Sequence, residues 1–409
     1  MDCGAESVVE CEPGRLTIDF NNPKALVELT RCLMKRDFGV DLEIPQDRLC
    51  PPVPGRLDYI LWIQDLVDST DPSTDDFDYD LERDVSGLDI GAGSTCIYPI
   101  LACKTRPKWK VYGTDIDEKS YNYAVANVER NHLESQIKLL FTLKETSLFP
   151  LLEFKIDRLD FTMCNPPFYE SVEEMLQSAR EKSYPAFSSC TGSESEMITP
   201  GGEAAFVARM IEESKAVRDK IQWFTSILGK LSSLTIIVEK LKEENISNYA
   251  LGTVMQGNRT KRWVVAWSFS DRRPSNIIVH PPVGSLSSLL PPSTEFKISC
   301  PKGFTKQTWI NTINLIIRRN QLQWTWSSHH LEGCAEIFGN TWSRAARRSA
   351  SRGVSVTAAK EPVMRVKIKI QFNILDDTST IFTKWLQGTE PLLFQSFCGM
   401  LKRAIHTEK

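Results

Sequence analysis

Five apolar runs between residues 86 and 228 alternate with helical patterns, and this alternation restricts the possible folds more than any other feature. β-branched and aromatic residues predict strands at residues 86–90, 110–114, 137–143, 159–164 and 221–228. Amphipathic segments between them predict helices, including 118–132 and 202–220. Strands that alternate with helices form a parallel sheet covered on both faces, so the predicted fold class is α/β.

Two further strands, at 248–255 and 262–269, are predicted on either side of a polar turn. A β-hairpin at the end of a doubly wound sheet is typical of class I methyltransferases rather than of dinucleotide-binding domains. We therefore predict a Rossmann-like class I methyltransferase with a seven-stranded sheet that ends in a β-hairpin. Two N-terminal helices precede it, the first starting at Asn22 and Pro23, because asparagine caps helices and proline fits their first position.

The charge of the chain is unevenly distributed. Residues 295–409 contain 17 Lys and Arg against 8 Asp and Glu, a net charge of +9, whereas residues 1–294 carry −12. A basic third on an acidic body favours a domain that binds a polyanion, and a solvated basic surface is the alternative. The strand and helix patterns within 295–409 predict a small α+β fold, with a loose Ser/Arg-rich segment at 339–359.

Residues 271–294 contain five prolines and a serine run, a composition typical of a linker. The predicted domains are therefore 1–272, with the N-terminal helices and the methyltransferase; a linker at 273–294; and an RNA-binding domain at 295–409. No run of about 18 apolar residues exists, so no membrane span is predicted. The eleven cysteines are scattered without a CxxC pair, which predicts reduced thiols and no metal site.

The first predicted strand is followed by a Gly-Ala-Gly turn at 91–93. Such a turn lets the backbone approach a nucleotide at the switch point of the sheet, and Cys96 in place of a third glycine argues against NAD. The second strand ends near Asp115, where a carboxylate can accept hydrogen bonds from both ribose hydroxyls. Alternatively, Asp115 or Asp117 caps the helix that follows. The turn and the acid together predict a cofactor site.

The fourth predicted strand is followed by Asn-Pro-Pro-Phe, a motif suited to methylating an amino nitrogen. Adenine N6 is a poor nucleophile because its lone pair is delocalised into the ring. The Asn165 side-chain carbonyl and the Pro166 backbone carbonyl can accept both amino protons and aim the lone pair at a methyl donor. The prolines fix the backbone, and Phe168 offers a ring for a flipped base. The predicted catalytic residues are Asn165, Pro166, Pro167 and Phe168.

In combination, several runs resemble the methyltransferase-like protein 16 family. They are Val-Pro-Gly-Arg-Leu-Asp-Tyr at 53–59, Asp-Ile-Gly-Ala-Gly at 89–93, the motif at 165–168, Gln-Gly at 256–257 and Ala-Trp-Ser-Phe at 266–269. The resemblance covers residues 14–272. Members of this family methylate adenosine N6 in U6 spliceosomal RNA, and bacterial relatives modify large-subunit ribosomal RNA. The sequence departs from the family at the inserted Asn258 and at the loop 183–199, which lacks the family's Arg- and Pro-rich composition.

The resemblance implies S-adenosylmethionine as cofactor and S-adenosylhomocysteine as product. Arg56 would contact the cofactor's carboxylate, Gly91 its methionine part, Asp115 its ribose and Thr146 the region of its adenine. The full set of predicted cofactor residues is Arg56, Asp89, Gly91, Gly93, Asp115, Thr146 and Asn165. The expected partner is a structured RNA, U6 spliceosomal RNA first, for a monomeric protein of the nucleus, with the cytoplasm as a second location.

Basic residues at two places are candidates for RNA contacts. Those at the hairpin turn can meet phosphates near the active site, and those in the basic third are interleaved with tryptophans that suit unpaired bases. These candidates are Arg259, Lys261, Arg262, Arg318, Arg319, Arg347 and Arg348. Four other functions stay open. One is a ribosomal RNA adenine methyltransferase; two are a protein glutamine methyltransferase and a DNA adenine methyltransferase, which share the Asn-Pro-Pro-aromatic motif; the last is a catalytically dead RNA-binding scaffold.

Overall fold

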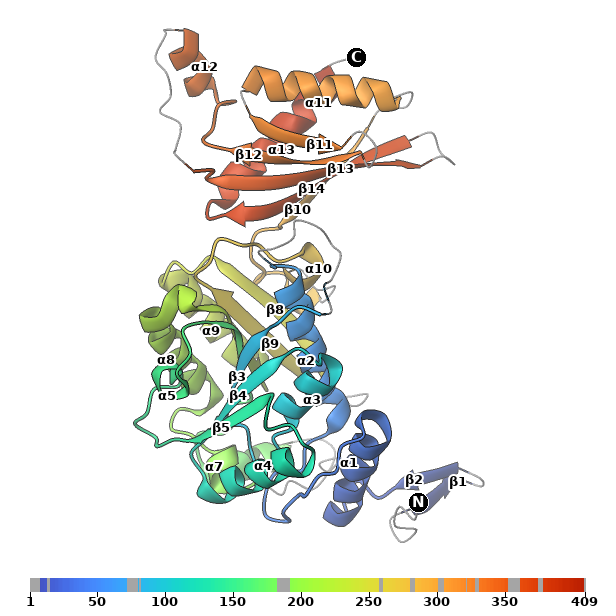
Figure 1. The fold of residues 1–409 in the computed structure, drawn as a ribbon, viewed down its shortest axis with the longest axis vertical. Coiled ribbons are helices and arrows are strands. Elements are labelled where there is room, and N and C mark those ends of the chain that lie inside the picture. The colour runs from blue at the N-terminus through green and yellow to red at the C-terminus, as the bar shows by residue number, and fades with distance from the viewer. Residues whose placement is uncertain are drawn as a thin grey trace. The chain divides into compact units, whose positions relative to one another are not determined.

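The computed structural model divides the chain into two compact units (Figure 1). Unit 1 comprises Met1–Val67 and Asp80–Ser270, and unit 2 comprises Asp68–Tyr79 and Asp271–Lys409. Unit 1 contains a seven-stranded sheet and unit 2 a five-stranded sheet. The structure describes residues 8–12, 15–71, 80, 82–181, 192–256, 260–279, 284–300, 305–320, 322–327, 331–351, 361–373 and 378–407.

The sheet of unit 1 has the strand order β5-β4-β3-β6-β7-β9-β8. Neighbours from β5 to β7 are parallel, and β9 and β8 continue the sheet antiparallel as the terminal hairpin. The predicted class I methyltransferase fold is thereby confirmed. The strands are β3 Ser86–Ile90, β4 Lys110–Asp115, β5 Ile137–Phe141, β6 Leu159–Cys164, β7 Ile221–Leu228, β8 Asn248–Gln256 and β9 Thr260–Ser268.

Helices cover both faces of this sheet, with α2 and α3 on one side and α8 and α9 on the other (Figure 1). The helices that follow β3 in unit 1 are α3 Ile97–Thr105, α4 Glu118–Arg130, α5 Leu151–Phe154, α6 Val172–Glu181, α7 Glu194–Met197, α8 Gly202–Val217 with the 3-10 turn η2 Arg218–Lys220, and α9 Leu231–Glu243. The central strands β6 and β7 are covered on both sides, so their side chains are buried along nearly their whole length. Gly87 is required beneath the Phe161 ring, since a Cβ there would lie 2.2 Å from it.

The N-terminal part consists of a hairpin, which the sequence did not predict, and two helices. The hairpin pairs β1 Val8–Glu12 with β2 Arg15–Ile18. Helix α1 Pro23–Phe38 begins as predicted, because the Asn22 side chain accepts the Lys24 N–H at 3.0 Å. Helix α2 Val53–Asp68 is the second predicted N-terminal helix, for which the apolar pattern of the sequence indicates residues 57–67, so it starts four residues earlier than that pattern indicates. Its buried apolar side chains are Val53, Tyr59, Ile60, Ile63, Leu66 and Val67.

Unit 2 is an antiparallel sheet with helices packed on one face, as predicted for an α+β fold. Its strand order is β10-β14-β13-β12-β11, and its core includes Trp309, Trp385 and Phe397. Trp324 and Trp326 stack on each other and pack partly buried against this core. The elements are β10 Glu295–Ser299, α11 Lys306–Asn320, β11 Gln323–Ser327, β12 Glu332–Ile337, α12 Arg344–Ser351, β13 Met364–Asn373, β14 Thr378–Gly388 and α13 Pro391–Thr407.

The structure differs from the sequence-based expectation in parts of unit 2. Strands β12 and β14 were not predicted, and α12 occupies the segment expected to be loose. The expected linker at 273–294 contains α10 Asn276–Val279 and the 3-10 turn η3 Gly284–Leu286. Ile278, Val279 and Leu286 are buried there, and the Arg273 Nε donates to the Gly388 carbonyl at 2.8 Å. This segment is therefore packed into unit 2, and the units divide at 270/271.

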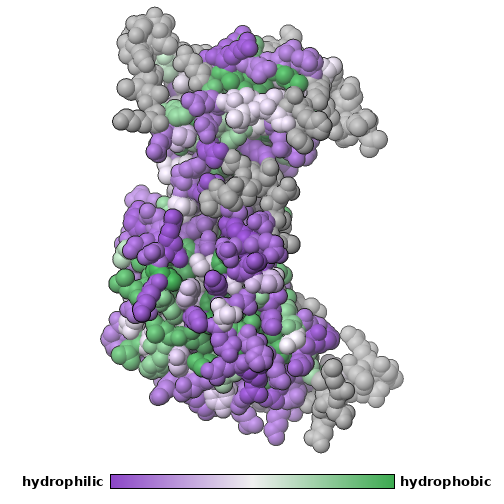
Figure 2. Space-filling view, in the orientation of Figure 1, coloured by the Kyte–Doolittle hydropathy of each residue, from purple (hydrophilic) through white to green (hydrophobic). Residues whose placement is uncertain are grey.

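Hydrophilic side chains cover much of the visible surface, and hydrophobic surface gathers on unit 1 in the region of α5 and β5 (Figure 2). None of the described helices is long and apolar enough to cross a membrane. Within the described ranges, no group of three or more His, Cys, Asp or Glu is arranged to hold a metal ion. Cys32 is disulfide-bonded, so the expectation that every cysteine is reduced is wrong at that position.

Candidate active site

The carboxyl ends of β3, β4 and β6 meet at the switch point of the sheet in unit 1, and the glycine turn lies there. Gly91 and Gly93 have φ angles of +79° and +66°, a conformation that favours glycine. The N–H groups of Gly91 and Ala92 both donate to the Thr114 carbonyl at 2.9 Å, which ties the turn to β4. A Cβ on Gly91 would meet nothing within 4 Å, so a ligand has room to approach the main chain.

Asp115 and Asp117 have separate roles at the end of β4. Asp115 accepts the Gly93 N–H at 2.8 Å and the Asp117 N–H at 2.9 Å. Asp117 is the N-cap of α4 and accepts the Ser120 N–H at 2.8 Å. Burial raises the pKa of Asp115, and its two N–H donors oppose that shift. The helix cap is therefore Asp117, and Asp115 stands beside the glycine turn, where a ribose acceptor was predicted.

The environment of the Asp89 carboxyl group shows whether the site suits the cofactor. The residue is fully buried, and neither carboxylate oxygen has a hydrogen-bond partner among the described residues. Burial raises the pKa of Asp89 to about 8; Asp115 adds to the shift and Arg56 opposes it. An unpaired buried carboxylate costs free energy that a nearby cation offsets. The site thus fits the cationic amino-acid end of S-adenosylmethionine.

Arg56 and Thr146 come from different elements of unit 1. Arg56, in α2, donates from Nη1 to the Tyr98 hydroxyl at 2.8 Å. Its positive charge acts to lower the pKa of Asp89. Thr146 lies in the turn after β5, where its hydroxyl accepts the Leu143 N–H at 3.2 Å. Leu143 is 62% exposed beside this turn. The structure thus places Arg56 near Asp89 and Thr146 in the turn after β5, next to an exposed leucine.

The catalytic motif follows β6 directly. The Asn165 side-chain oxygen is buried and has no hydrogen-bond partner within the described part of the chain. Pro166 is buried, and Pro167 and Phe168 are half-buried. An unpaired buried acceptor costs about 1–3 kcal/mol. Because this cost disappears when a donor arrives, the site favours a ligand that brings an N–H to Asn165.

Arg262 packs on the catalytic motif instead of extending from the hairpin tip. Its guanidinium lies 4.8 Å from the centroid of the Phe168 ring, and burial lowers its pKa. A Cβ on Gly229 would lie 3.0 Å from the Arg262 side chain and 3.2 Å from Phe168. Glycine at 229 therefore permits the close approach of hairpin and motif.

The other predicted RNA contacts are distributed over both units. Lys261 is exposed on β9, 5.4 Å from the Trp263 ring centroid, and Arg259 lies outside the described residues. Arg318 and Arg319 are in the last turn of α11. Arg347 and Arg348 lie in α12, where Arg348 is exposed. Among the described candidates of unit 1, Arg262 is the one whose side chain packs on the catalytic motif.

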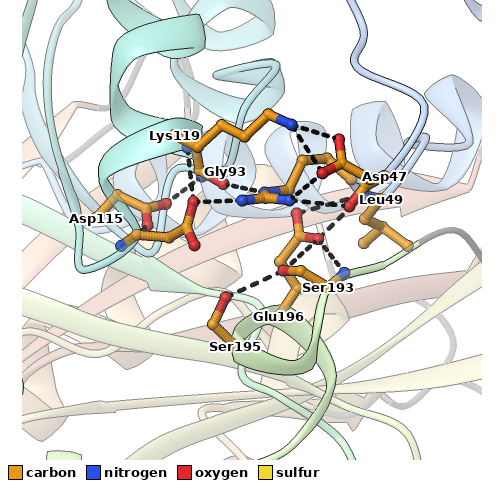
Figure 3. Close-up of polar contacts among 11 residues, drawn as sticks. Asp47, Leu49, Gly93, Asp115, Lys119, Ser193, Ser195 and Glu196 are labelled. Atoms are coloured by element: carbon orange, nitrogen blue, oxygen red, sulfur yellow. Dashed lines mark hydrogen bonds and ion pairs between the residues drawn. The ribbon is translucent and has the colours of Figure 1, made fainter.

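Sequence reasoning missed a polar network beside the glycine turn (Figure 3). Arg48 is 8% exposed and donates to Asp117 at 2.8 Å and to Ser120 at 3.0 Å. The next residue, Leu49, donates its N–H to the Glu196 carboxylate at 3.1 Å. No spacing rule connects residues 48 and 49 with 196, so only the tertiary structure identifies these contacts.

The fold and the site define a class I methyltransferase. A family model described as RNA methyltransferase matches residues 5–271. The U6 small nuclear RNA (adenine-(43)-N(6))-methyltransferase of Schizosaccharomyces pombe is 36% identical over 392 residues, 96% of this chain and 96% of that protein. The chain belongs to this family of RNA methyltransferases, which includes the METTL16 proteins.

Other relatives match unit 1 in particular. Human RNA N(6)-adenosine-methyltransferase METTL16 is 38% identical over 263 residues, 63% of this chain and 45% of that protein. The solved human catalytic domain in complex with the MAT2A 3′UTR hairpin 1 has a TM-score of 0.58 at 34% identity and covers 65% of this chain and 87% of that one. The human N-terminal domain in complex with SAH has a TM-score of 0.53 and also 34% identity, over 65% of this chain and 90% of that one.

Proposed function

We propose that this protein transfers a methyl group from S-adenosylmethionine to N6 of an adenosine in a structured RNA. The observation that carries the proposal is the buried side-chain oxygen of Asn165 at the end of β6, which has no hydrogen-bond partner among the residues that the structure describes. It lies in a class I methyltransferase fold of the RNA methyltransferase family. An amino group of a flipped base supplies the missing donor.

Each residue of the catalytic motif has a separate role in the proposed methyl transfer. Bound S-adenosylmethionine supplies an electrophilic methyl group. Asn165 and the Pro166 carbonyl accept the two amino protons and orient the nitrogen lone pair. Phe168 stacks on the base, a contact worth about 1–3 kcal/mol. No general base is needed, because the proton leaves after the nitrogen has become cationic.

The cofactor would be held by residues that follow or end β3, β4 and β5, together with Arg56 of α2. Asp89 would pair with its ammonium group, Arg56 with its carboxylate and Asp115 with its ribose hydroxyls. Gly91 and Gly93 would let its methionine part approach the main chain, and Thr146 would stand near its adenine. This assignment accounts for the buried, unpaired Asp89 and for the open space at Gly91.

The substrate we propose is U6 spliceosomal RNA, modified in the nucleus by a monomer. This is supported by the Schizosaccharomyces pombe relative, whose similarity extends over both units. Unit 2 would hold the RNA. It is basic, and one face of its sheet has a pocket of about 230 Å³ lined by seven residues: Glu295, Lys367, Lys369, Gln371, Phe382, Thr383 and Lys384. Unit 2 also carries the predicted contacts Arg318, Arg319, Arg347 and Arg348.

A methyl-transfer assay with tritiated cofactor tests the function. Purified protein is incubated with total RNA, DNA or a protein extract, and labelled nucleosides are identified by chromatography. We expect N6-methyladenosine in RNA, concentrated in U6. Label in ribosomal RNA would identify ribosomal RNA as the substrate in place of U6. Label in protein glutamine would identify the enzyme as a protein methyltransferase, and no transfer to any fraction would favour a binding scaffold.

A further inference from the structure

The chain that follows α7 holds the residue next to the catalytic motif. The Tyr169 N–H donates to the Met197 carbonyl at 3.0 Å, and the Thr199 N–H donates to the Tyr169 carbonyl at 2.9 Å. These bonds form a short parallel β-bridge. Because Tyr169 directly follows Phe168, the end of the catalytic motif is held by main chain that begins one residue after Glu196.

The Glu196 carboxylate makes two sets of contacts. One set caps its own helix, α7, and the other joins it to a distant segment of the chain. It accepts the Ser193 N–H at 2.8 Å and the Ser193 hydroxyl at 3.0 Å, which completes a capping box. It also accepts the Leu49 N–H, at 3.1 Å to one oxygen and 3.3 Å to the other. A capping box needs only the first set, so the second set serves the tertiary structure.

Leu49 belongs to a segment that is anchored on the cofactor side. Its neighbour Arg48 donates to Asp117 and Ser120 at the start of α4. Asp117 in turn donates its N–H to Asp115, the predicted ribose acceptor. Glu196 is therefore linked through residues 48 and 49 to the end of β4.

Glu196 also lies against the glycine turn. A Cβ built on Gly93 would be 4.0 Å from Glu196 Oε1, an ordinary van der Waals contact. Figure 3 shows Glu196 in the same polar network as Gly93 and Asp115, with its carboxylate bonded to Leu49 and Ser193. The negative charge of Glu196 is among the causes that raise the pKa of Asp115. Glu196 thus accepts the Leu49 N–H and lies near the cofactor turn, and the main chain that follows it is joined to the residue after the catalytic motif.

We propose that Glu196 is a positioning residue that assembles the cofactor half and the target-base half of the site together. Its carboxylate holds Leu49 against the cofactor turn, and the chain after it holds Tyr169. The inference rests on the proposed methyl transfer. Charge-assisted bonds of this kind, when lost, weaken an interaction about ten- to hundredfold.

The test compares Glu196→Ala with Glu196→Gln in the full chain. We measure S-adenosylhomocysteine affinity by calorimetry and the single-turnover methylation rate on a U6 hairpin at saturating cofactor. Glu196→Ala is expected to weaken cofactor affinity and slow the single turnover, each about tenfold or more. Glu196→Gln keeps one oxygen for the Leu49 N–H and is expected to recover part of both losses.

Two matched variants separate positioning from a capping role. Ser193→Ala removes the capping hydroxyl and leaves the Leu49 contact, and Glu194→Ala removes an exposed carboxylate from the same helix. Both are expected to keep cofactor affinity and turnover within about twofold. If Glu196→Ala matches the wild type in both measurements, or if it fails to fold and Glu196→Gln shows neither loss, the proposal is overturned. Wild-type inactivity on RNA would overturn the proposed function instead, because the calorimetric comparison does not depend on RNA.

Discussion

The guanidinium of Arg262 lies 4.8 Å from the centre of the Phe168 ring, so the terminal hairpin packs on the catalytic motif. Arg262 comes from β9 and Phe168 follows β6, with β7 between these strands in the sheet. Gly229, directly after β7, leaves the space in which the two side chains meet. The ring that we propose to stack on the target base is therefore packed against a cation.

Replacing Arg262 by Met should slow methylation more than it weakens RNA binding. The cation–π contact is worth about 0.5–2 kcal/mol, so turnover at saturating RNA should fall about 2- to 30-fold. Lys261→Met removes an exposed charge from the same strand and serves as the control. Weaker RNA binding with unchanged turnover would show instead that Arg262 contacts a phosphate.

Replacing Asn165 by Ala should abolish methyl transfer and leave cofactor and RNA affinity close to the wild-type values. Removing one acceptor that orients the nitrogen typically costs about 10²–10³ in rate. Single-turnover kinetics at saturating RNA and cofactor measure the effect. Near-normal turnover by this variant would exclude the mechanism in which Asn165 orients the amino group.

Asp115→Ala and Asp117→Ala should have different effects, although the two residues are only two positions apart. Asp115→Ala removes the proposed ribose acceptor. Because a charge-assisted hydrogen bond contributes about 1.5–3 kcal/mol, this variant should bind the cofactor about tenfold or more weakly. Asp117→Ala removes the cap of α4 and should lower stability by about 1 kcal/mol. Calorimetry and thermal unfolding are the measurements. Equal cofactor affinity in both variants would contradict the separation of roles.

Cofactor affinity should increase with pH because of Asp89. Its pKa of about 8 in the free protein means that the carboxyl is mostly protonated at pH 6. A bound ammonium group favours the ionised form, so binding releases a proton and strengthens as pH rises from 6 toward 8. Calorimetry in two buffers of different ionisation enthalpy measures the proton release. Asp89→Asn should bind more weakly and without this dependence; an equal dependence in the variant would assign it to another group.

A chain ending at Ser270 should retain cofactor binding and methylate at saturating RNA, but bind RNA more weakly. The larger part of unit 2, Asp271–Lys409, is basic, so its removal should take away phosphate contacts and the gain from tethering two binding sites. RNA affinity should also fall less steeply with salt. Affinity measured against salt for both chains tests this expectation. Identical slopes would mean that unit 2 binds something other than RNA.

Local sequence was sufficient where an element is defined by its own residues. Strands β3, β6 and β7 end at the predicted positions, because each is an apolar run bounded by polar residues or turn-forming residues. The Asn-Pro-Pro-Phe motif could be read directly, since its chemistry depends on adjacent backbone and side-chain acceptors. The cap at Asn22 is equally local.

Tertiary structure decided what depends on residues distant in the chain. Strand β12 has no alternating apolar pattern of its own and is a strand because it pairs with β13 and β11. The two candidate caps at the end of β4 could be distinguished only by their donors. The contact between Leu49 and Glu196 joins residues with no common sequence pattern. Such contacts form where folding brings distant donors and acceptors together, so their partners are determined by packing rather than by spacing in the sequence.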